Sequence, residues 1–176
     1  MTLSEIIAAG IAPALALLPA NMDTPEARVM LLAIGLQESR FEHRRQLVGN
    51  PPRPVGPAKS FWQAEQGGGM VHGVRLHVVT RAAAAHLYQA RGVSARDAAI
   101  WNAIESDDVL AASLARLLLW SDPLPLPEVG VEEDSWALYL RTWRPGAYAR
   151  GTSVQRAELR AKWRRNYALA VDEVAG

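Results

Sequence analysis

Apolar residues recur at helical spacing along almost the whole of this chain, and this pattern limits its fold more than any other feature. After Ser106, for example, Leu110, Leu114 and Leu117 fall on one side of a helix. No stretch alternates apolar and polar residues well enough to predict a strand. A chain of 176 residues can enclose one substantial core. We therefore predict an all-α single domain of roughly seven to eight helices.

Capping residues, prolines and glycines indicate where these helices begin and end. Thr24 can cap a helix with Pro25 at its first position, and we expect this helix to run to about Arg45. Ser106 is the expected cap of the leucine-rich helix. Prolines predict loops at 47–59 and 121–127. The other expected helices cover 3–18 with a bend at Pro13, 78–91, a short segment from 94, 136–143 and 153–174.

The composition is that of a globular protein, and it excludes several kinds of function. Apolar residues make up 49% of the chain and charged residues 21%, and the net charge of +1 gives no strong overall field. Without cysteine there is neither a disulfide framework nor a thiol nucleophile. The apolar run at 6–18 has no basic residue before it and is too short to cross a bilayer. We expect a buried first helix there, and neither a signal peptide nor a membrane span.

Glu38 is the most informative residue, because it lies on the apolar side of its expected helix together with Leu31, Ile34 and Phe41. A carboxyl group kept from water has a raised pKa and can hold a proton near neutral pH, as a general acid must. The alternative is a glutamate at the edge of the buried face whose head group turns to water. Periodicity alone leaves both interpretations open.

A second candidate segment lies at 56–64, where Phe61 and Trp62 precede the amide of Gln63. Proteins bind sugars with aromatic faces and amide groups, so this combination is typical of a carbohydrate site. Taken alone, however, the two aromatic residues suit core positions better than a ligand platform.

Together, these segments resemble the lysozyme-like soluble lytic transglycosylases and their phage-encoded wall-degrading relatives. The shared motifs are Glu-Ser-x-Phe at 38–41 and Trp-Gln at 62–63, behind a loop that contains glycine. The resemblance implies that Glu38 is the catalytic acid and base, that Ser39 supports it, and that Trp62 and Gln63 contact the glycan. It also implies a single lysozyme-like domain over 1–176, with a catalytic core at about 24–150 and a basic C-terminal helix at about 153–174.

A third family element, a tyrosine followed by Asn-x-Gly, has only a partial match. Tyr139 is the nearest candidate, with Trp143 and Gly146 shortly after it, but the asparagine is missing. Tyr148 competes with Tyr139 for this place. By the resemblance, Tyr139 and Trp143 would help to bind the glycan.

The resemblance implies cleavage of the β-1,4 bond between N-acetylmuramic acid and N-acetylglucosamine in peptidoglycan, with no cofactor and no metal. A transglycosylase needs one carboxyl group, whereas a hydrolase needs a second one to position water. Glu65, which follows Gln63 closely, is a better candidate for the second group than Glu42. Lyase and hydrolase both stay open, and the family favours the lyase.

Peptidoglycan strands would then be the main partner. Because no ordinary signal peptide is evident, we expect action in the periplasm or after delivery by a phage tail or a secretion system. A phage structural component that keeps the fold without activity is an alternative. Another alternative is a helical protein that binds nucleic acid, although nucleic acid is a less expected partner than peptidoglycan. The eight basic residues and one acidic residue from Arg141 to Arg165 suggest such a surface, but a solvated helix face explains them as well.

Other chemistries have little support in the sequence. The four histidines show none of the spacings of a zinc helix motif, and no nucleophile elbow is present. The glycines at 67–69 lack the lysine that follows in a phosphate-binding loop.

Overall fold

The computed structural model describes all 176 residues, which are mostly helical. In chain order the elements are α1 (Leu3–Ile6), a π-helical turn (Ile7–Ile11), α2 (Ala12–Ala16), a 3₁₀ turn (Ala20–Met22), α3 (Pro25–Glu38), β1 (Arg45–Val48), β2 (Arg53–Lys59), a second π-helical turn (Gly69–Gly73), α4 (Val74–Leu76), α5 (Arg81–Ala90), α6 (Asp97–Ala103), α7 (Asp108–Trp120), α8 (Glu132–Trp143), α9 (Gly146–Arg150) and α10 (Ser153–Ala175). The prediction of a mainly helical chain is confirmed, but the prediction that it contains no strand is wrong.

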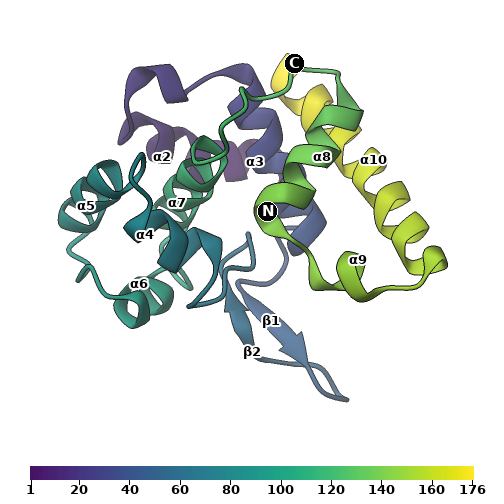
Figure 1. The fold of residues 1–176 in the computed structure, drawn as a ribbon, viewed down its shortest axis with the longest axis horizontal. Coiled ribbons are helices and arrows are strands. Elements are labelled where there is room, and N and C mark those ends of the chain that lie inside the picture. The colour runs from purple at the N-terminus through teal and green to yellow at the C-terminus, as the bar shows by residue number, and fades with distance from the viewer.

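Helix α7 lies in the middle of the molecule (Figure 1). Every residue from Leu110 to Leu119 is at most 9% exposed, because α2, α3, α5 and α8 all contact this helix. A helix that is apolar on all sides is stable only when it is enclosed in this way. Its cap is Asp107, whose carboxylate accepts a hydrogen bond of 2.9 Å from the amide of Leu110. The predicted cap, Ser106, is therefore wrong by one position.

Helix α3 packs along the C-terminal helix α10. Trp163 of α10 is fully buried, and its ring stacks on that of Tyr139 of α8, with centroids 4.8 Å apart and planes 18° apart. Figure 1 shows α3, α8 and α10 on one side of α7, with α4, α5 and α6 on the other. The predicted C-terminal helix is confirmed, and one of its faces belongs to the hydrophobic core.

The end of α3 differs from the prediction, because the helix stops at Glu38 and does not reach Arg45. Arg40 and Phe41 both adopt the left-handed conformation, with φ of 57°. The ring of Phe41 packs over Gly35, in the space that a Cβ at that position would occupy. This tight turn puts Glu38 at the C-terminal end of α3 instead of in its middle.

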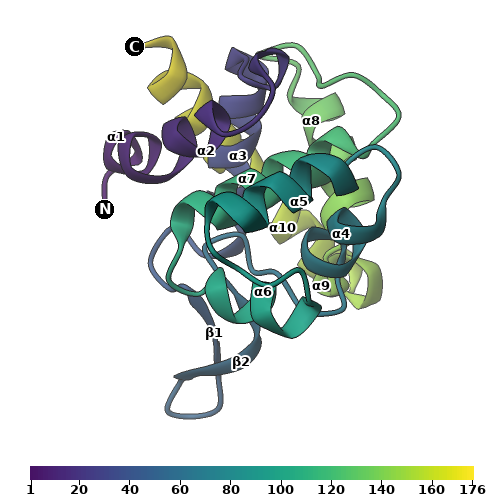
Figure 2. The same cartoon turned by 90° about the vertical axis from the view of Figure 1, so that its left-hand side faces the viewer.

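Strands β1 and β2 form an antiparallel hairpin that projects from the lower part of the molecule (Figures 1 and 2). Arg45 lies opposite Lys59, and Val48 lies opposite Arg53. The prediction of a loop at 47–59 is wrong. A two-stranded sheet has a free edge on both sides, where prolines that lack an N–H are tolerated.

The N-terminal segment is helical as predicted for 3–18, but its geometry changes just before Pro13. The π-helical turn at Ile7–Ile11 separates α1 from α2. A wider turn of this kind accommodates the proline ring and its missing donor. No helix in the structure combines the length with the apolar character that crossing a membrane requires.

Candidate active site

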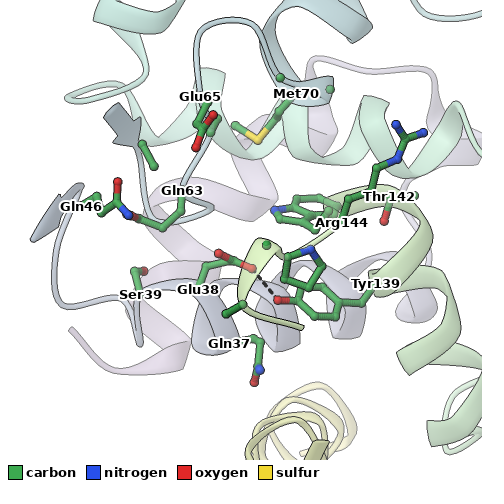
Figure 3. Close-up of a pocket in the computed structure, with 18 of the residues that line it drawn as sticks. Gln37, Glu38, Ser39, Gln46, Gln63, Glu65, Met70, Tyr139, Thr142 and Arg144 are labelled. Atoms are coloured by element: carbon green, nitrogen blue, oxygen red, sulfur yellow. Dashed lines mark hydrogen bonds between the residues drawn. The ribbon is translucent and has the colours of Figure 1, made fainter. Parts of the chain in front are cut away.

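A cleft with a volume of about 700 Å³ opens beside the C-terminal end of α3. Its walls come from the hairpin, from the segment 63–70, from the ends of α8 and α9, and from α10 (Figure 3). The predicted site residues that line it are Glu38, Ser39, Gln63, Glu65, Tyr139 and Trp143. The fold thus brings together side chains that are up to about a hundred positions apart in the sequence.

Glu38 lies in this cleft with a carboxyl group that is largely removed from water. Its Oε1 accepts a hydrogen bond of 2.7 Å from the hydroxyl of Tyr139 (Figure 3). Burial raises the pKa of Glu38 to about 7, while the hydrogen bond from Tyr139 and the positive charge of Lys162 act against this rise. Both protonation states are then populated near neutral pH, as a group that gives and later takes a proton requires. The alternative of a head group turned to bulk water is wrong.

Helix α10 fixes the last turn of α3 through Gln37, the residue before Glu38. Nδ2 of Asn166 donates to Oε1 of Gln37 at 2.8 Å. Nε2 of Gln37 donates to the carbonyl oxygen of Leu159 at 3.3 Å, and Nζ of Lys162 donates to the Gln37 carbonyl oxygen at 2.5 Å. Burial lowers the pKa of Lys162, while the charge of Glu38 opposes that effect. These contacts hold a positive charge close to the candidate acid.

Sequence reasoning missed Gln37 and Lys162 as parts of the site. The only available signals were the position of Gln37 beside Glu38 and the basic character of the C-terminal helix. Neither signal indicates that α10 packs against the end of α3, because that contact spans more than a hundred residues of sequence.

Ser39 connects the two segments that the sequence singled out. Its hydroxyl donates to the carbonyl oxygen of Phe61 at 2.7 Å, and its Oγ accepts from the amide of Phe41 at 3.1 Å. The first bond fixes the segment that carries Gln63 next to the end of α3. Ser39 therefore stabilises the geometry of the cleft, and its hydroxyl proton is already engaged.

Gln63 lines the cleft in a left-handed conformation with φ of 52°. Its Nε2 donates to the carbonyl oxygen of Ser60 at 2.8 Å and to that of His43 at 3.4 Å. Because both amide hydrogens are used, Oε1 is the group left free to accept a hydrogen bond from a ligand. Glu65 lines the cleft as an exposed residue, and Figure 3 shows it across Gln63 from Glu38.

Trp62 does not contact the cleft, so the prediction that it binds substrate is wrong. It is fully buried, and its Nε1 donates to the carbonyl oxygen of Leu31 at 2.9 Å. The alternative interpretation, in which Phe61 and Trp62 are core residues, is confirmed, since Phe61 is only 2% exposed. Trp143 does line the cleft, and its Nε1 donates to the carbonyl oxygen of Trp62 at 3.0 Å. The indole N–H of Trp143 is thus used within the fold and is not free to bind a ligand.

The structure distinguishes between the two candidate tyrosines. Tyr139 contacts Glu38, and burial raises the pKa of its hydroxyl, so that it stays a neutral donor. Tyr148 instead packs its ring edge-on against Trp136, with centroids 5.3 Å apart, and does not line the cleft.

The basic residues of the C-terminal third are divided between ion pairs and the cleft. Arg160 pairs with Glu132 and Glu133 of α8. Arg144 and Arg150 line the cleft instead. No group of three or more His, Asp or Glu side chains is arranged to hold a metal ion.

The fold and the cleft define a mostly helical protein in which a carboxyl group with a raised pKa, that of Glu38, lies among polar side chains. Comparison with known proteins adds no relative, since no family model, no curated protein and no solved structure matches the chain. The function must therefore be argued from the cleft.

Proposed function

We propose that the protein cleaves the glycan strands of peptidoglycan, with Glu38 as general acid and then general base. The observation that carries the proposal is the pKa of about 7 that burial gives Glu38, in a cleft of about 700 Å³. A pocket of this size has room for sugar rings. A phage component without activity would not need an open cleft above this carboxyl group, so the cleft also favours an enzyme.

The reaction begins with protonated Glu38. Its proton passes to the bridging oxygen as the bond to C1 of N-acetylmuramic acid breaks, and positive charge develops on that ring. The carboxylate of Glu38 then removes the proton of the muramyl 6-hydroxyl, whose oxygen forms the new bond to C1. The product has an anhydro ring, and Glu38 ends in its initial protonated state.

The surrounding residues support this cycle. The Tyr139 hydroxyl stabilises the carboxylate that forms after the first proton transfer, and the charge of Lys162 acts in the same direction. The free Oε1 of Gln63 can accept a hydrogen bond from an acetamido N–H of the glycan.

A hydrolytic version of the reaction would use Glu65 to position a water molecule. Glu65 and Glu38 line the same cleft (Figure 3). The hydrogen-bonded pair of Glu38 and Tyr139 completes an acid–base cycle without a second carboxylate, and for this reason we favour the lyase.

Mass analysis of muropeptides from purified sacculi tests the proposal. We expect anhydro ends with the parent protein, and about 10²–10⁴-fold slower release with Glu38→Gln. Reducing ends that disappear in Glu65→Gln would indicate the hydrolase. Intact sacculi, or full activity of Glu38→Gln, would contradict the proposal.

The nucleic-acid hypothesis has less support. Arg160 is engaged by two glutamates, and Arg156 donates to the carbonyl oxygens of Tyr148 and Ala149. These basic side chains are used within the protein and do not form a free, continuous stripe along α10.

A further inference from the structure

A second cavity, with a volume of about 470 Å³, lies at the other end of α3. Glu26, in the first turn of α3, lines this cavity. Glu26 and Glu38 are 12 residues apart on one helix, which corresponds to about 18 Å along the axis. No residue lines both cavities. The second cavity is thus separate from the cleft, and the proposed chemistry does not use it.

Arg116 is the unusual residue of this cavity, because it is a buried cation without an anionic partner. The residue is 2% exposed, and no carboxylate forms an ion pair with it. Its Nε donates to the carbonyl oxygen of Met22 at 2.9 Å, but its Nη1 is buried with no hydrogen-bond partner. Burial lowers its pKa to about 10. A buried guanidinium with unused donors is costly, and because Arg116 lines the cavity, an oxygen acceptor on a ligand there would offset part of that cost.

An exposed aromatic side chain lies next to this guanidinium. Trp120, the last residue of α7, is 37% exposed, and the guanidinium carbon of Arg116 lies 5.2 Å from its ring centroid. Tryptophan is highly buried on average, and partly exposed indole rings are enriched at binding surfaces. Leu124, which is 57% exposed, adds an apolar surface to the same cavity.

Three further polar side chains of the cavity are free, whereas Thr24 caps α3 and Asp122 pairs with Arg141. Asn21 and Glu26 make no side-chain hydrogen bond and no ion pair, and the same holds for the carboxylate of Glu128. All three line the cavity. An indole face surrounded by an amide, carboxylates and a guanidinium offers acceptors for sugar hydroxyls, donors for sugar oxygens and a surface for the C–H face of a ring.

We propose that this cavity is a second carbohydrate-binding site, in which Trp120 carries the sugar ring and Arg116 donates to one of its oxygens. A ligand that carries a carboxylate is less favourable, because Glu26 and Glu128 would repel it. A neutral sugar avoids this repulsion and can donate hydroxyl protons to both carboxylates.

Tryptophan indole NMR signals allow the two cavities to be observed separately. Trp120 reports on the second cavity and Trp143 on the cleft, and the substitutions Trp120→Phe and Trp143→Phe assign the two signals. The probe is the trimer of N-acetylglucosamine, added to the full-length Glu38→Gln protein so that no cleavage occurs. We expect a saturable shift of the Trp120 signal, whether or not the Trp143 signal moves.

Substitutions in the second cavity then test which groups bind the sugar. Trp120→Ala should weaken the interaction seen at this cavity about tenfold, with a lower affinity for insoluble chitin as the readout. Asn21→Ala should weaken it less. Leu169→Ala is the control, because it also shortens an exposed apolar side chain but lies outside both cavities.

Two results would overturn this proposal. One is a Trp120 signal that stays in place at saturating trimer, and the other is a shift caused by succinate but not by the trimer. Neither result depends on activity at Glu38, so failure of this proposal is distinguishable from failure of the proposed cleavage reaction.

Discussion

The hydroxyl of Tyr139 donates a hydrogen bond of 2.7 Å to Oε1 of Glu38, between residues 101 positions apart in the chain. Tyr139 is 2% exposed, and its ring stacks on Trp163 at 4.8 Å. The donor is therefore held by the packing of α8 against α10. The interaction stabilises the charged form of Glu38 and limits the rise of its pKa.

Replacing Tyr139 by phenylalanine should raise the pKa of Glu38 further. The substitution removes the hydrogen bond to the carboxylate and leaves burial unchanged. A ¹³C NMR titration of the glutamate carboxyl carbons measures this directly. Tyr148→Phe is the matched control, because Tyr148 packs on Trp136 away from the cleft. An equal titration curve for both variants would show that Tyr139 does not influence Glu38.

Lys162→Met should also raise the pKa of Glu38, because a nearby positive charge is lost. In the proposed reaction protonated Glu38 starts the cycle, so the alkaline limb of the pH–rate profile should move to higher pH. Arg164→Gln is the control, since Arg164 is largely exposed and lies 3.9 Å from Glu132 on α8. Should both variants keep the parent profile, the charge of Lys162 has no effect on catalysis.

The raised pKa of Glu38 also predicts a dependence of stability on pH. Its folded value of about 7 exceeds the ordinary value of 4.5, so between these values the folded state binds more protons than the unfolded state. The free energy of unfolding should therefore fall as pH rises through this window, by about 3 kcal/mol in total. Glu38→Gln removes this loss. In urea unfolding, the free energy of unfolding of Glu38→Gln should increase relative to that of the parent between pH 5 and pH 8. An equal difference between the two proteins at both pH values would contradict the prediction.

Gly35→Ala should destabilise the protein by about 1–3 kcal/mol, because the new methyl group overlaps with the ring of Phe41. The displaced ring would disturb the turn after Glu38, so activity should fall with stability. Gly67→Ala is the matched control. A Cβ at Gly67 meets no atom within 4 Å, and a change below about 0.5 kcal/mol is expected. Equal thermal midpoints for the two variants would show that the contact between Phe41 and Gly35 is not tight.

Much of the helical framework could be predicted from the sequence because its signals are local. Apolar spacing marked α7 and α10, and Thr24 with Pro25 marked the start of α3. The end of α3 was missed, since the turn at Arg40 and Phe41 depends on a ring that packs over Gly35. Helical periodicity carries no information about a non-glycine residue in the left-handed conformation.

The candidate site was predictable only in part, for a similar reason. Glu38 stood out as a carboxyl group on an apolar face, and it lies half-buried in the cleft. Trp62 and Gln63 are adjacent, yet one is buried and the other lines the cleft. Their separation depends on the left-handed conformation of Gln63. The contacts of Gln37 with Lys162 and Asn166 required the tertiary fold, because no local pattern pairs α3 with α10.

These contacts of Gln37 have a consequence for the order in which the protein becomes competent. Asn166 and Lys162 are synthesised more than a hundred residues after Gln37. A nascent chain that contains Glu38 but not α10 therefore lacks Asn166, which binds Gln37, and Lys162, whose positive charge lies near Glu38. Glu38 can acquire its working environment only after α10 has been synthesised, and a chain terminated before α10 would lack the groups that adjust the pKa of this carboxyl group.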